Sequence, residues 1–316
     1  MPTMRYRQLG RSGLTVSVVG LGCNNFGRRL GLEQTRAVVD AALDAGVTLF
    51  DTADIYGESE DLLGEVLAGR RDGVVLATKF GKPMDGRIAP EHEARGSRRY
   101  IRRAVESSLR RLRTDYIDLL QMHEPDERTP IEETLAALGE VVRDGKVRYI
   151  GSSNFAAWQV AEADAVARRA AGPPFISAQN EYNLLDRRVE LELVPACEHF
   201  GLGLLPFFPL ASGLLTGKYR RGTEAPTGTR LAGRLEGIAE ARFDRVEALT
   251  KFAESRGIGV LDVAIGGLAA QPTVGSVIAG ATKPEQVRAN VAAGEWQPDR
   301  GDLEALDEIC PRGSFA

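Results

Sequence analysis

Cysteine, histidine and tryptophan are scarce in this chain. Its 316 residues include three cysteines, three histidines and two tryptophans. The cysteines, Cys23, Cys197 and Cys310, are odd in number and far apart, and none forms a C-x-x-C pair, so a disulfide framework or a cysteine-built zinc centre is not expected. His123 also lacks a second histidine at the spacing of zinc proteases. The sequence therefore predicts no metal site.

The chain also lacks a strong excess of one charge and any long apolar run. A formal net charge of −4 gives no bulk attraction to nucleic acid or to an acidic membrane surface. The most apolar stretch, residues 202–215, is interrupted by Pro206 and Pro209, and the first residues carry no apolar signal core. We expect a cytoplasmic protein with neither a nucleic-acid nor a membrane partner; the sequence leaves its oligomeric state open.

What the chain does contain is a regular alternation of short apolar runs and longer amphipathic segments. Its length exceeds the usual single-core limit of roughly 250 to 300 residues, which leaves two domains or one α/β barrel. The apolar runs are typical of buried parallel strands. They cover residues 16–21, 48–51, 74–79, 116–121, 147–152, 175–179, 202–207 and 274–279. Eight strands, each followed by a helix, predict an α/β fold: a (β/α)8 TIM barrel, one domain over residues 1–316, with an extra terminal helix.

Helices are expected between these runs. Apolar positions in residues 100–113 recur at helical spacing. Thr129 is the predicted N-cap of a helix with Pro130 at its first position, and Thr282 repeats the pattern before the last regular helix. Two further helices are predicted at about 241–256 and 261–270. Segments 81–97 and 212–240 are expected to form loops at the barrel mouth.

Polar side chains end five consecutive predicted strands. Active sites of such barrels lie at the carboxyl ends of the strands. The residues there are Asp51 with Tyr56 just beyond it, Lys79, His123, Ser153 with Asn154, and Gln179 with Asn180. Each alone is more often structural than catalytic. Because consecutive strands are neighbours in a barrel, their ends share one small volume, and together these residues indicate a single site.

A tyrosine beside a lysine, an aspartate and a histidine predicts proton transfer to a carbonyl oxygen. The tyrosine pKa is ordinarily near 10, and a lysine about 4 Å away would favour the phenolate by roughly three pKa units at an effective dielectric constant of 20. Asp51 would hold Lys79 and partly cancel this effect. Tyr56 is then the expected general acid, with a neutral His123 orienting the same oxygen.

A carbonyl protonated in this way still needs a hydride, which no side chain supplies, so a nicotinamide cofactor is implied. Ser153, Asn154 and Gln179 could hydrogen-bond its carboxamide, and Phe207 could stack on its ring. Residues 280–290 place a lysine in a turn before a helix N-terminus, which suits a phosphate. No complete G-x-G-x-x-G fingerprint or phosphate loop is present.

Over nearly its whole length the sequence resembles the aldo-keto reductase superfamily. The motifs that carry the resemblance are FDTADIYG (50–57), ATKF (77–80), MHEPD (122–126), GSSNF (151–155), SAQNEYN (177–183), PFFPLASGLLTGKY (206–219) and VIAGATKPEQVRAN (277–290). The resemblance implies a (β/α)8 barrel that reduces small-molecule aldehydes or ketones with a nicotinamide cofactor, NADPH rather than NADH. The implied catalytic tetrad is Asp51, Tyr56, Lys79 and His123. The implied cofactor set is Ser153, Asn154, Gln179, Phe207, Leu210, Gly213, Lys218, Gly280, Thr282, Lys283, Gln286 and Asn290.

Three positions depart from the family pattern. Phe207 stands where tyrosine or tryptophan is common, Phe208 where a serine usually follows, and Ala289 where a glutamate is frequent. The first change keeps an aromatic face, and the second removes one polar contact to the cofactor. Two alternatives to a general carbonyl reductase remain open at this point. One is a cofactor-binding regulatory subunit with little turnover, as in the channel-associated β subunits, and the other is a reductase of a sugar or polyketide intermediate.

Overall fold

A ring of parallel strands forms the centre of the molecule. The structure, a computed structural model, describes residues 4–84, 86, 88–233, 235 and 238–316. Within them an eight-stranded parallel sheet runs in the order β10-β3-β4-β5-β6-β7-β8-β9. Its strands are β3 (Val19–Gly22), β4 (Leu49–Asp51), β5 (Val75–Phe80), β6 (Ile117–Met122), β7 (Val147–Ser153), β8 (Phe175–Gln179), β9 (Gly203–Leu204) and β10 (Val277–Gly280).

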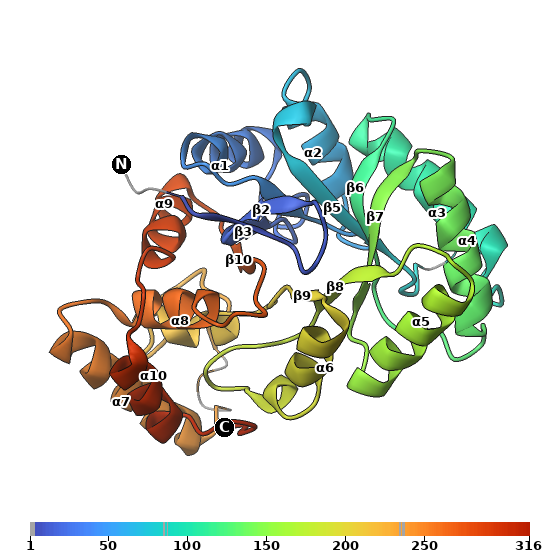
Figure 1. Ribbon diagram of the computed structural model, residues 1–316. Coiled ribbons are helices and arrows are strands. Elements are labelled where there is room, and N and C mark those ends of the chain that lie inside the picture. Colours follow the sequence, from blue (N-terminus) through green and yellow to red (C-terminus); the bar gives the residue numbers. More distant parts are fainter. Residues whose placement is uncertain (1–3, 85, 87, 234, 236–237) are drawn as a thin grey trace.

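Backbone hydrogen bonds join the two ends of this sheet. The Leu204 amide donates to the Thr273 carbonyl at 2.7 Å, and the Gly275 amide donates to the Leu204 carbonyl at 2.8 Å. The Ile278 amide likewise donates to the Pro206 carbonyl at 3.0 Å, which brings β9 beside β10. Figure 1 shows the helices arranged around the outside of the strands. The predicted (β/α)8 barrel is confirmed.

The helices follow from amphipathic patterns in the sequence. They are α1 (Leu32–Asp44), α2 (Ser59–Val66), α3 (Arg98–Leu112), α4 (Ile131–Arg143), α5 (Ala157–Arg169), α6 (Leu193–Phe200), α7 (Glu240–Ser255), α8 (Val260–Ala269), α9 (Pro284–Ala293) and α10 (Arg300–Ile309). Short 3-10 helices are η1 (Arg71–Gly73), η2 (Arg188–Glu190) and η3 (Ala211–Thr216). In α3 the predicted stripe of Ile101, Val105 and Leu109 is buried, and the Ser97 hydroxyl caps the helix by accepting from the Tyr100 amide at 3.3 Å.

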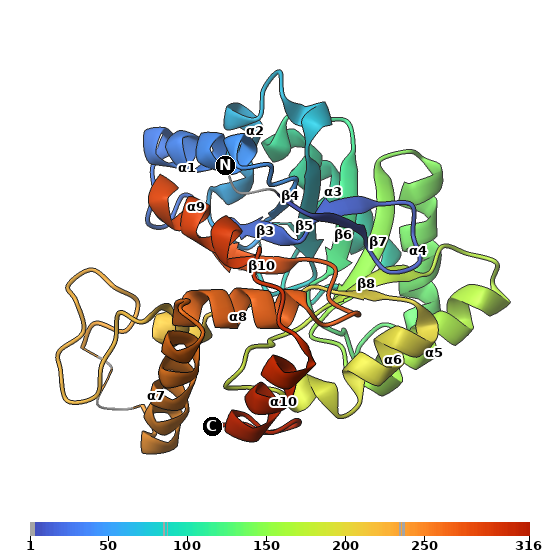
Figure 2. The ribbon, with the colours of Figure 1, turned by 60° about the vertical axis from the view of Figure 1, so that its left-hand side comes forward.

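The predicted extra terminal helix is α10. It lies with α7 to one side of the barrel (Figure 2). Leu249 and Phe252 of α7 share a buried apolar cluster with Leu306 of α10. Arg256, just after α7, pairs with Asp302 at 2.7 Å. Among the described residues, every helix is too short or too polar to be a membrane span.

Two predicted strands differ from those observed. Residues 16–21 do not form one strand: β2 (Thr15–Ser17) pairs antiparallel with β1 (Tyr6–Gln8), and only β3 enters the barrel. The break lies at Ser17, whose hydroxyl donates to the Val19 carbonyl at 2.8 Å and accepts from the Thr48 amide at 3.0 Å. Strand 202–207 shortens to β9, because Pro206 has no amide to donate to the ladder.

The predicted helix caps are also wrong in detail. The Thr129 hydroxyl donates to Asp126 at 2.9 Å rather than capping α4, whose cap position is Pro130. At α9 the cap residue is Lys283, with Pro284 in the first turn, and Thr282 donates its amide to Gln286 Oε1 at 2.7 Å. In both cases the threonine lies one residue further from the helix than the capping pattern requires.

Both long segments follow strands at their carboxyl ends. Segment 81–97 joins β5 to α3, and segment 212–240 begins within η3 and ends at the start of α7. Lys82 of the first segment, and Ser212, Gly213 and 227–230 of the second, line the cavity described below. Residues 85, 87, 234, 236 and 237 of these segments lie outside the described residues.

Candidate active site

A cavity of about 770 Å³ opens at the carboxyl ends of the barrel strands. Asp51 at the end of β4 and His123 after β6 line it, together with Tyr56 from the turn beyond β4. Lys79 of β5 lies behind this wall and contacts Asp51. The predicted cofactor residues all line the same cavity: Ser153, Asn154, Gln179, Phe207, Leu210, Gly213, Lys218, Gly280, Thr282, Lys283, Gln286 and Asn290. The structure thus brings these residues to one place. Asn180, also expected at a strand end, does not line the cavity, and its side-chain amide donates to the Phe155 carbonyl at 3.2 Å.

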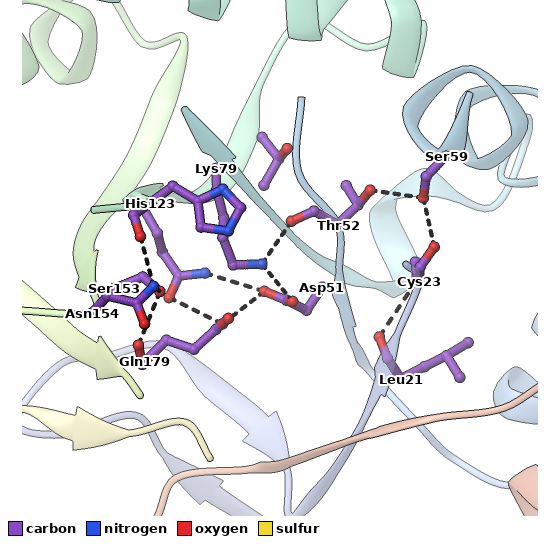
Figure 3. A network of polar contacts seen from close by, with 12 residues as sticks. Leu21, Cys23, Asp51, Thr52, Ser59, Lys79, His123, Ser153, Asn154 and Gln179 are labelled. Atoms are coloured by element: carbon purple, nitrogen blue, oxygen red, sulfur yellow. Dashed lines mark hydrogen bonds and ion pairs between the residues drawn. The ribbon is translucent and has the colours of Figure 1, made fainter. Parts of the chain in front are cut away.

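A buried ion pair lies at the base of the cavity. Lys79 Nζ is 2.6 Å from Asp51 Oδ2 and donates to the Thr52 carbonyl at 2.8 Å (Figure 3). The other oxygen, Asp51 Oδ1, accepts from Gln179 Nε2 at 2.8 Å and from Gln121 Nε2 at 3.2 Å. Lys79 is 1% exposed and Asp51 3%. Both charges are therefore paired and hydrogen-bonded, as burial requires.

Tyr56 lies against this pair from a tight turn. Its amide donates to the Ala53 carbonyl at 3.0 Å, and Gly57 follows with φ of 64°, a conformation that favours glycine. Lys79 Nζ is 5.2 Å from the centre of the Tyr56 ring. The His123 ring meets the Tyr56 ring edge-on, with centroids 5.8 Å apart. Aspartate, tyrosine, lysine and histidine thus form one compact group.

The expected lowering of the Tyr56 pKa is wrong in its net direction. Burial raises the pKa of Tyr56 above its usual value of 10, and this outweighs the opposing effect of Lys79, which Asp51 also weakens. For Lys79, burial works against the charge, but Asp51 and Tyr56 more than compensate and raise its pKa. At neutral pH Tyr56 is therefore a protonated phenol beside a charged ammonium group.

His123 is neutral at physiological pH. Burial, with further contributions from the charges of Lys79 and Lys82, lowers the pKa of His123 to about 2. Its backbone amide donates to the Phe80 carbonyl at 2.7 Å, which fixes the residue at the end of β6. Nδ1 of its ring is buried and has no hydrogen-bond partner among the described residues. A neutral imidazole can donate one hydrogen bond, as the sequence analysis expected.

Three polar side chains at the carboxyl ends of β7 and β8 form the wall beside His123. Asn154 has a left-handed φ of 60°, and its amide donates to the Gln179 carbonyl at 3.0 Å. Asn154 Nδ2 donates to the His123 carbonyl at 2.8 Å, and Ser153 Oγ donates to the Gln179 carbonyl at 2.9 Å. Since the side-chain nitrogens of Asn154 and Gln179 are engaged, their side-chain oxygens are the groups available to a ligand.

The far part of the cavity is built from loops. Phe207 and Leu210 contribute half-buried side chains, and the backbone between them and η3 is unusual. Phe208, Ala211 and Ser212 all have positive φ, at 53°, 45° and 58°. Such conformations are uncommon for residues other than glycine and are often found at ligand sites. On the opposite side, residues 280–290 lead into α9.

Several residues in or beside the cavity were not predicted from the sequence. Gln121, which contacts Asp51, lies two positions before His123 on β6, so strand alternation could have identified it as inward-facing. Arg28 and Arg29 follow β3, whose carboxyl end also points into the cavity. Arg230 arrives from the 212–240 segment. No local signal marks these three arginines, because tertiary packing of loops places them.

The described residues contain no group of three or more histidine, cysteine, aspartate or glutamate side chains suited to holding a metal ion. Cys23, Cys197 and Cys310 are all buried free thiols. The donors gathered in the cavity are instead amides, a phenol, an imidazole and cationic groups, which suit an organic ligand with anionic parts.

Comparison with known proteins agrees with this geometry. The model of the Aldo/keto reductase family matches residues 18–310. An uncharacterized oxidoreductase, YrpG, of Bacillus subtilis (strain 168) is 39% identical over 98% of this chain and 96% of its own. A probable voltage-gated potassium channel subunit beta of Oryza sativa subsp. japonica is 39% identical over 92% of this chain and 91% of its own. The L-glyceraldehyde 3-phosphate reductase of Escherichia coli (strain K12) is 34% identical over 92% and 87%.

The resemblance predicted from the motifs is confirmed by a match that spans most of the barrel. Of the relatives just described, one is named as an oxidoreductase and one as a reductase. This chain is an oxidoreductase that belongs to the aldo/keto reductase family.

Proposed function

We propose that the protein reduces an aldehyde or ketone to an alcohol with NADPH, and that Tyr56 donates the proton. The observation that carries the proposal is the contact of Tyr56 with both the Lys79–Asp51 pair and His123 inside one cavity. Each of these groups has a distinct part in moving one proton to one oxygen.

Tyr56 enters the reaction as a protonated phenol, because burial keeps its pKa high. As negative charge grows on the carbonyl oxygen, the phenol proton moves to that oxygen and a phenolate forms. The Lys79 ammonium, 5.2 Å from the ring centre, stabilises this phenolate, and Asp51 keeps the ammonium in place. The alcohol leaves with the proton, and Tyr56 regains one from water.

His123 orients the carbonyl through a single hydrogen bond. Its Nδ1 is buried without a partner, and an orphaned buried N–H is more costly than an orphaned acceptor. We therefore assign the ring proton to Nε2, which donates to the substrate oxygen. Because the pKa of His123 is about 2, the ring stays neutral and does not compete with Tyr56 as the acid.

The cavity fits a nicotinamide cofactor. The free side-chain oxygens of Asn154 and Gln179 match the two N–H groups of a carboxamide, and Phe207 offers an aromatic face. When bound, the reduced nicotinamide supplies the hydride that no side chain can provide. Leu210, Gly213, Gly280 and Asn290 complete the lining along which the rest of the cofactor would be held.

Positive charge at the loop end of the cavity supports NADPH over NADH. We define the loop end as Arg29, Lys218, Arg230 and Lys283, all exposed side chains that line the cavity. A pyrophosphate carries two negative charges, and the extra phosphate monoester of NADPH adds about 1.5 to 2 more at pH 7. Four cations match the larger total of negative charge on NADPH.

We also propose that residues 1–316 form one barrel domain and that the protein is cytoplasmic.

The test is NADPH oxidation against a panel of aldehydes and ketones, comparing wild type with Tyr56→Phe. Removing the hydroxyl keeps the ring and its packing, so NADPH binding should persist while kcat/KM falls by about 100-fold to 10,000-fold, the usual worth of a general acid. Cofactor binding is measured in parallel by fluorescence. Equal activity in the two proteins would remove Tyr56 from the mechanism.

A second candidate function is a cofactor-sensing regulatory subunit. It is favoured by the 39% identity to the plant protein whose printed name is a potassium channel subunit beta. The compact group around Tyr56 argues for catalysis, because binding alone does not require a proton donor. Tight NADPH binding without turnover on the whole panel, together with a stable complex with a channel protein, would select this second function.

A further inference from the structure

Positive side chains line the cavity in excess of what the cofactor phosphates require. The lining cations are Arg28, Arg29, Lys82, Lys218, Arg230 and Lys283. Among the described lining residues, Asp51 is the only carboxylate, and Lys79 already neutralises it. The whole chain carries a net charge of −4, so this positive charge is local to the cavity. A cleft of one charge sign concentrates ligands of the opposite sign.

Two of these cations lie beside Tyr56 and His123 rather than at the loop end. The guanidinium of Arg28 is 5.8 Å from the centre of the Tyr56 ring, and it donates to the Ile55 carbonyl at 2.8 Å, which holds it over the Tyr56 turn. Lys82 follows β5 by two residues and is half-buried, and its charge acts on His123. Arg28 and Lys82 thus flank the two groups that meet the carbonyl oxygen.

Neither cation has an ion-pair partner among the described residues. Glu124 forms an ion pair with Arg95, whose guanidinium nitrogen is 3.2 Å from Glu124 Oε1. Proton donation by Tyr56 and orientation by His123 do not require Arg28 or Lys82, and two like charges at one site repel each other unless an anion lies between them. The charge of Arg28 opposes the burial that raises the pKa of Tyr56, but a substrate with a neutral body would leave both cations without an anion to contact.

We propose that the substrate carries a negatively charged group, either a phosphate monoester or a carboxylate, and that Arg28 and Lys82 bind this group while the substrate carbonyl contacts Tyr56 and His123. This inference rests on the proposed carbonyl reduction. The guanidinium of Arg28 retains donors beyond the one used by Ile55, and the ammonium of Lys82 supplies up to three. Such charge-assisted hydrogen bonds are the stronger class, so they select an anionic substrate over a neutral one.

The first experiment compares matched substrates. Glyceraldehyde 3-phosphate is set against glyceraldehyde, and succinic semialdehyde against butyraldehyde, with NADPH saturating. The wild type should favour the charged member of at least one pair by about tenfold or more in kcat/KM. The phosphate pair and the carboxylate pair separate the two anions. Raising the ionic strength should reduce the preference, because salt screens charges near the surface.

The variants Arg28→Met and Lys82→Met keep the apolar stems and remove the charges. Each should reduce the ratio of kcat/KM for the charged member to that for its neutral match by about tenfold. Arg110→Met on α3 and Lys251→Met on α7 are matched controls: both residues are exposed, lie outside the cavity, and should leave the ratio unchanged. Equal use of charged and neutral members by the wild type, or unchanged ratios in both variants, would overturn the proposal.

A binding measurement separates this inference from the proposed reaction. Glycerol 3-phosphate and succinate are each titrated into the complex with NADP+ by calorimetry, beside glycerol, in wild type and in Arg28→Met. Binding of the anion by the wild type but not by Arg28→Met supports the anion site. If the wild type binds the anion but turns over no carbonyl, only the proposed function fails. Turnover of neutral carbonyls with no detectable binding of glycerol 3-phosphate or succinate would contradict the anion site alone.

Discussion

The two ends of the cavity are built on opposite principles. At the reacting end, which we define as Asp51, Tyr56, Lys79, His123 and Gln179, most side chains are buried and are fixed to strand ends by hydrogen bonds. At the loop end, the side chains of Arg29, Lys218, Arg230 and Lys283 are exposed and have no ion-pair partner among the described residues.

This difference matches the two tasks. Proton transfer needs atoms held within a fraction of an ångström, which buried groups on rigid strands provide. Holding phosphates needs charge more than fixed geometry, and exposed side chains on loops can close around a ligand after it arrives. The reacting end should therefore contribute to protein stability, whereas the loop end should contribute mainly to affinity.

The largest expected effect comes from the same substitution made at each end. Lys79→Met leaves Asp51 buried and uncompensated, so the free energy of unfolding should fall by about 3 to 5 kcal/mol. Lys218→Met removes an exposed charge and should change it by less than about 0.5 kcal/mol. Urea denaturation followed by circular dichroism gives both values. Similar losses in the two variants would remove the contrast between the ends.

At the loop end, affinity is the quantity that should change. Lys283→Met removes one charge from the proposed phosphate site, so the Kd for NADPH should rise by about tenfold, and the Kd for NADH should rise less. Fluorescence titration measures both constants, and Lys251→Met on α7 is the control. If the Kd values for both cofactors stayed the same, Lys283 would not belong to the site.

Asp54 is an exception within the buried region and gives a smaller effect. It is 2% exposed, and neither carboxylate oxygen has a hydrogen-bond partner of good geometry among the described residues. Burial, and then the neighbouring charge of Glu60, raise the pKa of Asp54 well above its usual value. Ionisation therefore costs more in the folded than in the unfolded protein, and stability is lost as the pH rises from about 4 toward the folded-state pKa.

Asp54→Asn removes this cost. We expect the variant to be more stable than the wild type by about 1 kcal/mol at pH 8, with a smaller gain at pH 5. Thermal unfolding at the two pH values measures the difference. A variant that is less stable at pH 8 would show that the charged form of Asp54 stabilises the fold.

The smallest expected effect concerns the pH profile of kcat/KM, which the groups at the reacting end should leave flat near neutral pH. His123, with a pKa of about 2, stays neutral above pH 5, and Tyr56, with a pKa above 10, stays protonated below pH 9. Neither group should add a limb to the profile of kcat/KM between these limits. If activity were instead lost with an apparent pKa between 6 and 7, and if variants of the other titratable residues showed the same loss, His123 would be the group that ionises.

The sequence predicted the reacting end better than the loop end for a physical reason. The register of parallel strands fixes which residues reach the barrel rim, so Asp51, Lys79 and His123 could be placed from strand ends alone. The direction in which the pKa of Tyr56 shifts could not be predicted, because it depends on burial, which is a property of the packed structure.

The two mouth loops were expected, but the individual side chains that reach the cavity were not. Arg28 and Arg230 are placed there by contacts distant in sequence, those of Arg28 with the Ile55 carbonyl at 2.8 Å and of the Arg230 guanidinium with the Phe208 ring at 5.5 Å. Local capping patterns also misled, since Thr129 binds Asp126 instead of the helix it precedes. The spacing of apolar residues along the chain is a local property that can be read from the sequence, whereas these contacts are not local.

The most direct test of the central claim follows one hydrogen atom. NADPH carrying deuterium at the reactive ring carbon is incubated with the protein and a reducible aldehyde, and the alcohol is analysed by mass spectrometry. We expect deuterium on the carbinol carbon of the alcohol, and the wild type should form this alcohol at least about 100-fold faster than Tyr56→Phe. Alcohol without deuterium, or equal rates for the two proteins, would contradict it.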